Sequence, residues 1–138
     1  MVDYDIIMKR LEKLKGYILI LKKLKKTPRS QFIEDPFIHG LAERYLHLSI
    51  EALIDIGNHV ISDQKFKKPE TYAEIFEILF KNGIIPKTLY LKISDMPAFR
   101  NVLVHDYLDI DHGIVYKTLQ EKLELLEQLA KKFAKFIQ

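Results

Sequence analysis

Apolar residues recur at intervals of three and four positions along most of this chain, which is the spacing of one face of an α-helix. Residues 3–26 follow this pattern, with lysines at many of the remaining positions, and so do residues 35–63 and 112–137. No segment alternates apolar and polar residues in the way a half-buried strand does. The pattern therefore predicts an all-α fold with four to five helices in an up-and-down bundle.

Three polar residues mark positions where helices are expected to begin. Asp35 precedes Pro36, which is typical of an N-cap followed by proline at the first helical position. Thr71 and Glu74 have the spacing of a capping box, in which the Thr side chain caps the helix and the Glu side chain reaches back. Asp111 is expected to cap the last helix.

Other short segments are expected to separate the helices. Residues 27–30 should break the chain after the first helix, because proline disfavours helix for the residue before it. The Asn-Gly pair at residues 82–83 should end the third helix. Pro86 begins a further helical stretch, and residues 94–97 form a break or a kink before a helix over about 95–104.

Composition limits the class of protein. The 138 residues suit one domain, residues 1–138, and a hydrophobic content of 48% is enough for a packed core. The absence of cysteine excludes a disulfide scaffold, a thiolate nucleophile and a cysteine-ligated metal. No apolar run reaches the roughly 18 residues of a membrane span, and the charged N-terminal residues do not form a signal peptide. We therefore expect a soluble, cytoplasmic protein without a cofactor.

One segment combines residues suited to chemistry on RNA. Its spacing is R-x4-H-x-Y, from Arg100 through His105 to Tyr107, and the formal charge of +3 permits an anionic partner. Arg100 suits a phosphodiester, His105 can accept or donate a proton near neutral pH, and Tyr107 offers a phenol. Asn101 could orient the histidine or contact a sugar. These groups suit metal-independent cleavage, in which a base activates the ribose 2′-OH and an acid protonates the leaving oxygen.

Geometry and chemistry both indicate that one copy of this motif is incomplete. Five residues on a regular helix turn through about 140°, so Arg100 and His105 share a face only if the helix ends near Val104. Acid–base cleavage also needs two proton carriers, and the motif supplies one histidine. A symmetric homodimer would bring a second copy to a shared cleft. The alternative is a structural role, with Arg and His at the negative end of the helix dipole and Tyr107 in the core.

The chain resembles the HEPN superfamily, in its HepT-like toxin branch. The segment Arg-Asn-Val-Leu-Val-His-Asp-Tyr at residues 100–107 looks like the signature of that branch. The similarity follows the chain in order over nearly its whole length. Further matches lie in the segments expected to form the second helix and the middle of the chain: residues 43–46, 50–52, 55–59, 72–76 and 83–86.

This resemblance implies an all-α homodimer with RNase activity and the motif in the cleft between protomers. Arg100 and His105 would then be the catalytic pair, acting on RNA. Tyr107 would be the residue to which a cognate nucleotidyltransferase antitoxin of the minimal (MNT) type transfers AMP. An AMP group there would add negative charge and bulk where an RNA phosphate must sit.

The second predicted helix offers a rival interpretation as a metal site. Its His and carboxylate side chains recur at steps of four, at Glu43, His47, Glu51, Asp55 and His59. Such pairs can bind metal, but a di-metal bundle needs Glu-x-x-His sets that this chain lacks. We instead expect part of the stripe to line the dimer cleft.

Five residues are expected to support the catalytic pair. They are Arg44, Glu51 and Asp55 of the second predicted helix, which would buttress the motif, and Asn101 and Asp106 within the motif itself.

Two further alternatives stay open. The chain could be a non-catalytic HEPN module that only docks a nucleotidyltransferase or a nucleic acid, because such a module keeps the same residues. The lysines of residues 9–26 and of residues 65–68 could hold an RNA backbone electrostatically, or could form an ordinary solvated surface.

Overall fold

The computed structural model describes residues 4–106 and 108–136, and within these ranges it is helical without any strand. This confirms the predicted all-α fold. The described residues form more helices than the four to five expected, because the short helices α2 and α5 are separate elements. The seven helices are α1 (Tyr4–Lys25), α2 (Arg29–Glu34), α3 (Pro36–Asp63), α4 (Tyr72–Lys81), α5 (Lys87–Ile93), α6 (Met96–His105) and α7 (His112–Phe136).

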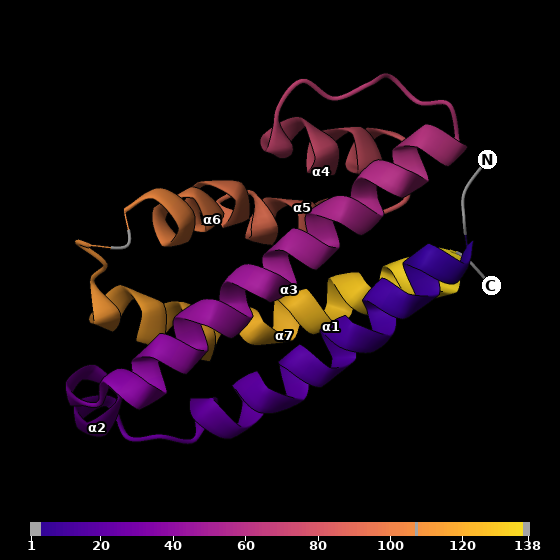
Figure 1. Ribbon diagram of the computed structural model, residues 1–138. Coiled ribbons are helices and arrows are strands. Elements are labelled where there is room, and N and C mark those ends of the chain that lie inside the picture. The colour runs from indigo at the N-terminus through magenta and orange to yellow at the C-terminus, as the bar shows by residue number, and fades with distance from the viewer. Residues whose placement is uncertain (1–3, 107, 137–138) are drawn as a thin grey trace.

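The three long helices form the body of the bundle. Figure 1 shows α1 and α7 side by side with α3 running across them, and α4, α5 and α6 along the other flank of α3. In Figure 1 the chain descends along α1 to the lower left, rises along α3, returns to the left along α5 and α6, and rises again along α7, which is an up-and-down order. Each fully buried aliphatic side chain in the centre stabilises the fold by about 1.5–3 kcal/mol. Completely buried examples are Leu14, Leu21, Leu53, Ile56, Leu119 and Leu129.

The predicted caps are present at the starts of α3, α4 and α7. The Asp35 carboxylate accepts a hydrogen bond from the N–H of Phe37 at 2.9 Å. The Thr71 hydroxyl accepts one from the N–H of Glu74 at 3.1 Å. The Asp111 carboxylate accepts one from the N–H of Gly113 at 2.8 Å. Each cap satisfies a backbone donor that the first helical turn leaves unpaired.

One detail of the predicted capping box differs. The Glu74 carboxylate accepts a hydrogen bond from the N–H of Glu70, at 2.8 Å, rather than from that of the capping residue Thr71. The carboxylate therefore ties down the end of the preceding loop as well as the first turn of α4.

The segment predicted as a break after α1 is partly helical. Pro28 has extended backbone angles, φ −61° and ψ 146°, and stands as the N-cap of α2, so the break is confined to the residues before Arg29. Proline is compatible with a helix start because no intrahelical hydrogen bond is required of its missing N–H. The completely buried Phe32 then anchors α2 against the bundle.

The helix that carries the motif extends one residue beyond its expected end. It runs from Met96 to His105, and Asp106 is its C-cap, donating its N–H to the carbonyl of Val102 at 3.0 Å. Gly83 ends α4 as predicted, with φ +75°, a conformation that glycine adopts without a steric penalty. Among the described residues, no helix has both the length and the apolar character needed to cross a bilayer.

Candidate active site

Three motif side chains line a single pocket at the end of α6. Arg100, Asn101 and His105 form one wall of a cavity of about 400 Å³. The opposite walls come from α3, from α4 and from the loop before α4, through Asn58, Pro69, Glu70, Thr71, Tyr72 and Ile75. His105 belongs to α6, so the helix does not need to end at Val104 for both motif residues to reach the same cavity. Arg100 and His105 are five residues apart in the chain, and both side chains line this pocket at the C-terminal end of α6.

Arg100 is held from several sides. Its Nε donates to the Glu51 carboxylate on α3, and its Nη1 donates to the Asn101 side-chain oxygen at 3.1 Å. Its guanidinium carbon lies 4.9 Å from the centre of the Tyr72 ring. Only 14% of the Arg100 side chain is exposed. Pairing and ring contact fix the cation at the pocket wall, which is the preorganisation needed to stabilise developing phosphate charge.

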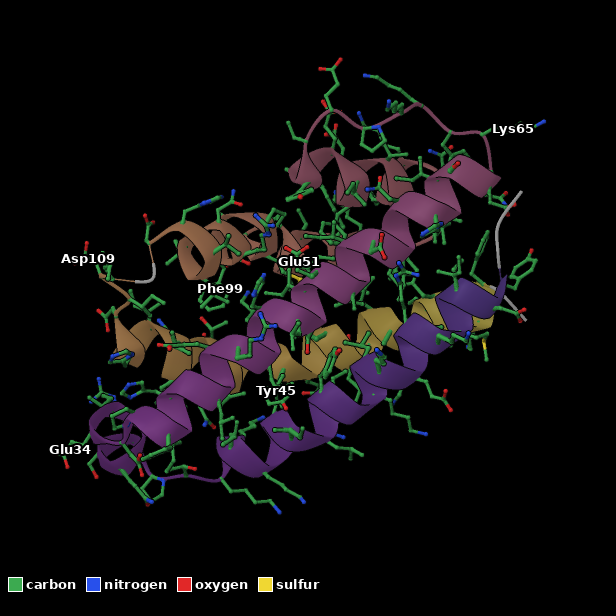
Figure 2. All side chains as sticks on the ribbon, in the orientation of Figure 1. Glu34, Tyr45, Glu51, Lys65, Phe99 and Asp109 are labelled. Atoms are coloured by element: carbon green, nitrogen blue, oxygen red, sulfur yellow. The ribbon has the colours of Figure 1, made fainter. Side chains whose placement is uncertain are left out.

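Glu51 also faces a histidine. The Nε2 of His47, one turn earlier on α3, lies 3.6 Å from the carboxylate oxygen that Arg100 contacts. Burial lowers the pKa of His47 below its usual 6.5, and Glu51 opposes this while Arg44 and Arg100 add to it. His47 is therefore held toward its neutral form beside the arginine. In Figure 2, Glu51 lies where α3 passes α6.

His105 is the candidate proton carrier, and its side chain lies in an open position. It is the last residue of α6 and it is exposed. No hydrogen bond restrains its ring within the part of the chain that the structure describes. The exposed Asp106 follows it as the helix cap. Tyr107, the expected AMPylation residue, lies outside the described residues.

The other predicted supporting residues do not all reach this pocket. Glu51 forms an ion pair with Arg100. Asp55 instead forms an ion pair with Arg10 of α1 and lines a neighbouring pocket. Arg44 is exposed and lines neither of these two pockets. Its charge adds to the effect of burial in lowering the pKa of His47.

The carboxylates of the stripe considered as a metal site each have a partner on another helix. Within the stripe, His47 lies near Glu51, and Nε2 of His59 lies 3.9 Å from the Asp55 carboxylate. The Glu43 carboxylate pairs with Nδ1 of His112 at 2.8 Å, Glu51 with Arg100, and Asp55 with Arg10. The His112 ring in turn stacks on His39, with ring centres 3.6 Å apart. Nowhere in residues 4–106 and 108–136 do three His, Asp or Glu side chains come together in a way that could hold a metal ion.

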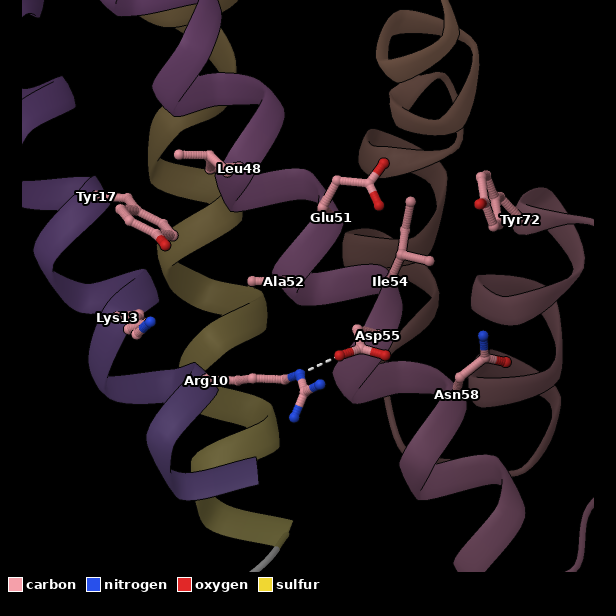
Figure 3. Close-up of a pocket in the computed structure, with 10 residues that line it drawn as sticks. All are labelled: Arg10, Lys13, Tyr17, Leu48, Glu51, Ala52, Ile54, Asp55, Asn58 and Tyr72. Carbon is pink, nitrogen blue, oxygen red and sulfur yellow. Dashed lines mark ion pairs between the residues drawn. The ribbon is translucent and has the colours of Figure 1, made fainter. Parts of the chain in front are cut away.

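Several pocket residues carry no motif that singles them out in the sequence. Asn58 and Tyr72 line both the motif pocket and a second pocket of about 340 Å³ between α1 and α3 (Figure 3). Lys13 and Tyr17 of α1 line that second pocket. Asn58 lies seven residues after Glu51, and this helical spacing could have placed it on the same face. The roles of Tyr72 and of the α1 residues in lining these pockets could not be predicted from the sequence, because they depend on how the helices pack.

Known proteins resemble this chain over nearly its full length. The mRNA nuclease HepT of Shewanella oneidensis is 31% identical over 124 residues, covering 90% of this chain and 92% of that protein. The tRNA nuclease HepT of Aphanizomenon flos-aquae is 34% identical over 123 residues, covering 89% and 84%.

A solved structure shows the same fold. The tri-AMPylated Shewanella oneidensis HEPN toxin, in complex with its MNT antitoxin, matches with a TM-score of 0.85 and 29% identity. The match covers 98% of this chain and 99% of the toxin chain. The family model described as ribonuclease HepT-like matches residues 4–133, and this chain therefore belongs to the HepT-like ribonuclease family.

Proposed function

We propose that this protein is a metal-independent RNA endonuclease and the toxin of a toxin–antitoxin pair. The observation that carries the proposal is the convergence of Arg100, Asn101 and His105 on one pocket, with Arg100 fixed by Glu51. The nuclease relatives support the reaction class, since both are named as RNA nucleases.

The pocket residues suit cleavage through the ribose 2′-OH. A base removes the 2′-OH proton, the 2′ oxygen attacks the adjacent phosphorus, and the bond from phosphorus to the 5′ oxygen breaks. An acid returns a proton to that 5′ oxygen, leaving a 2′,3′-cyclic phosphate and a 5′-OH. His105 is a proton carrier in this scheme, and Arg100 stabilises the extra negative charge on the phosphate.

The scheme needs two proton carriers, and we propose that a homodimer supplies them. One protomer contributes one His105 at the exposed end of α6. A twofold axis near that end would place a second His105 across the same cleft. Light scattering at working concentration tests this step, and a monomer of about the 16.3 kDa chain mass would contradict it.

We further propose control by a nucleotidyltransferase antitoxin of the MNT type, which would transfer AMP to Tyr107. The structural relative supports this, because it is an AMPylated toxin bound to an MNT antitoxin. AMP beside Arg100 and His105 would place a phosphate and a nucleoside where substrate RNA binds. We propose the cytoplasm as the place of action.

The catalytic proposal is tested with purified protein and RNA in the presence of EDTA. We expect cleavage by the wild type, loss of cleavage for His105→Ala, and retained cleavage for His39→Ala, a histidine of α3 that lines neither pocket. Circular dichroism checks that each variant is folded. Unchanged cleavage by His105→Ala would show that the assignment is wrong.

Expression in cells separates a toxin from a non-catalytic HEPN module. We expect growth arrest when the chain is expressed without its antitoxin, and relief of the arrest by Arg100→Ala. Normal growth on expression of a folded wild-type chain would instead favour the module, which docks a nucleotidyltransferase or a nucleic acid without cleaving RNA.

A further inference from the structure

We infer that the pocket between α1 and α3 binds the nucleotides of single-stranded RNA that flank the cleaved dinucleotide. This inference rests on the proposed ribonuclease function and adds a flanking subsite to it. The subsite is lined by Arg10, Lys13 and Tyr17 of α1 and by the facing side of α3 (Figure 3).

The two pockets are neighbours with shared walls. Tyr72 and Asn58 line both of them, so a strand that leaves the motif pocket passes these side chains as it enters the second one. The α3 residues of the second pocket extend from Leu48 to Asn58, a distance of about 15 Å at the helical rise per residue. That length exceeds one stacked nucleotide, at about 3.4 Å per base. The second pocket therefore has room for flanking nucleotides.

Among the charged side chains that line the second pocket, one cation has no carboxylate partner within the described part of the chain and is available to bind a phosphate. Both carboxylates in its wall already have arginine partners, because Asp55 pairs with Arg10 and Glu51 pairs with Arg100. Lys13 lies one turn after Arg10, and it has no ion-pair partner anywhere in the described ranges. An RNA phosphate would therefore meet an uncompensated ammonium group at Lys13.

Two tyrosine rings in the pocket wall offer surfaces on which RNA bases can stack. The Tyr17 ring packs against Tyr45, with centres 5.7 Å apart and planes tilted by 46°, which holds it in place at the pocket wall. Tyr72 is held in a similar way by Arg100, and 38% of it remains exposed. Rings of this kind beside cations are typical of sites for unpaired bases, which can stack on them, whereas the bases of a duplex are already stacked on each other. The arrangement favours single strands over double strands.

The test uses two substrates that differ only in flanking length. One is a dinucleotide, confined to the motif pocket, and the other is a single-stranded oligonucleotide with the same cleaved step at its centre. For Lys13→Ala and Tyr17→Leu we expect KM on the long strand to rise about tenfold, with kcat unchanged and with cleavage of the dinucleotide unaffected. Tyr17→Phe keeps the ring and should behave as the wild type. Lys13→Ala should also reduce the slope of the logarithm of the affinity against the logarithm of the salt concentration by about one.

Lys15→Ala is the matched control, because Lys15 is an exposed lysine of the same helix that lines neither pocket. Equal effects of Lys13→Ala and Lys15→Ala would overturn the subsite and indicate nonspecific attraction. A change in oligomeric state or in antitoxin binding for Lys13→Ala, without a change in KM, would overturn it in favour of a protein interface.

Measuring RNA binding without cleavage distinguishes a failure of this inference from a failure of the proposed function. Fluorescence anisotropy with a single strand that carries 2′-O-methyl groups measures affinity without any cleavage. If the wild type binds this strand but cleaves no RNA, the proposed function fails while the subsite is supported by weaker binding of Lys13→Ala. If the wild type cleaves RNA and Lys13→Ala binds as tightly as the wild type, the subsite alone is wrong. Absence of wild-type binding would overturn both.

Discussion

Glu51 of α3 and Arg100 of α6 form an ion pair between positions 49 residues apart in the chain. The pair fixes the guanidinium at the wall of the motif pocket, while Asn101 and the Tyr72 ring contact it from other directions. This ion pair forms because α3 passes α6 at Glu51 (Figure 2).

Removing the charge of Glu51 should therefore impair cleavage more than folding. For Glu51→Gln we expect kcat for RNA cleavage to fall about tenfold, because a charge-assisted hydrogen bond to Arg100 becomes a weaker neutral one. Glu43→Gln is the control on the same helix, since Glu43 pairs with His112 away from the pocket. It should keep kcat, with any loss appearing in the melting temperature. Equal kcat values for the two variants would contradict the role of Glu51.

The lowered pKa of His47 should make stability depend on pH. Between the folded pKa and the usual value of 6.5, the unfolded chain binds more protons at this residue than the folded protein does. The free energy of unfolding should therefore fall as pH falls through that window, and this residue should have no effect on it above the window. Urea unfolding at about pH 7.5 and about pH 5 measures the change. His47→Gln should show a smaller loss than the wild type, and an equal loss in both would refute the assignment.

Alanine substitutions at two glycines, one in a packed and one in an open position, test how tightly the helices of the bundle pack. A Cβ on Gly57 of α3 would lie 2.8 Å from Cγ2 of Ile75, whose branched side chain cannot move away easily, so Gly57→Ala should destabilise the fold by about 1–3 kcal/mol. A Cβ on Gly16 of α1 meets nothing within 4 Å, and Gly16→Ala should stabilise the helix by about 0.5–1 kcal/mol. Thermal unfolding of both variants tests the contrast. Shifts of the same sign would contradict it.

Local signals in the sequence were sufficient to predict most helix boundaries. The caps at Asp35, Thr71 and Asp111 depend on a side chain and a backbone N–H two or three residues away, so the sequence contains both partners. Helix α2 was missed because Pro28 was interpreted as a break, although a proline can also stand just before a helix. The buried Phe32 that holds α2 in place depends on contacts with distant helices.

The site was predictable in part. The motif pointed to Arg100 and His105 as candidates because their chemistry and spacing lie within one short segment, and the fold brings both to one pocket. Glu51 was expected as a support, but its pairing with Arg100 and the diversion of Asp55 to Arg10 follow from how α1, α3 and α6 cross. Tyr72 was overlooked as a site residue because an isolated tyrosine at a helix start has no spacing that points to Arg100.

The order in which the ribosome makes the chain has a consequence for when the site can exist. Glu51 is synthesised well before Arg100, and α7, which packs against α1 and α3, is synthesised last. A growing chain that has released α3 but not α6 has the carboxylate without its arginine. The complete pocket, with Arg100 paired to Glu51, should therefore form only near the end of translation.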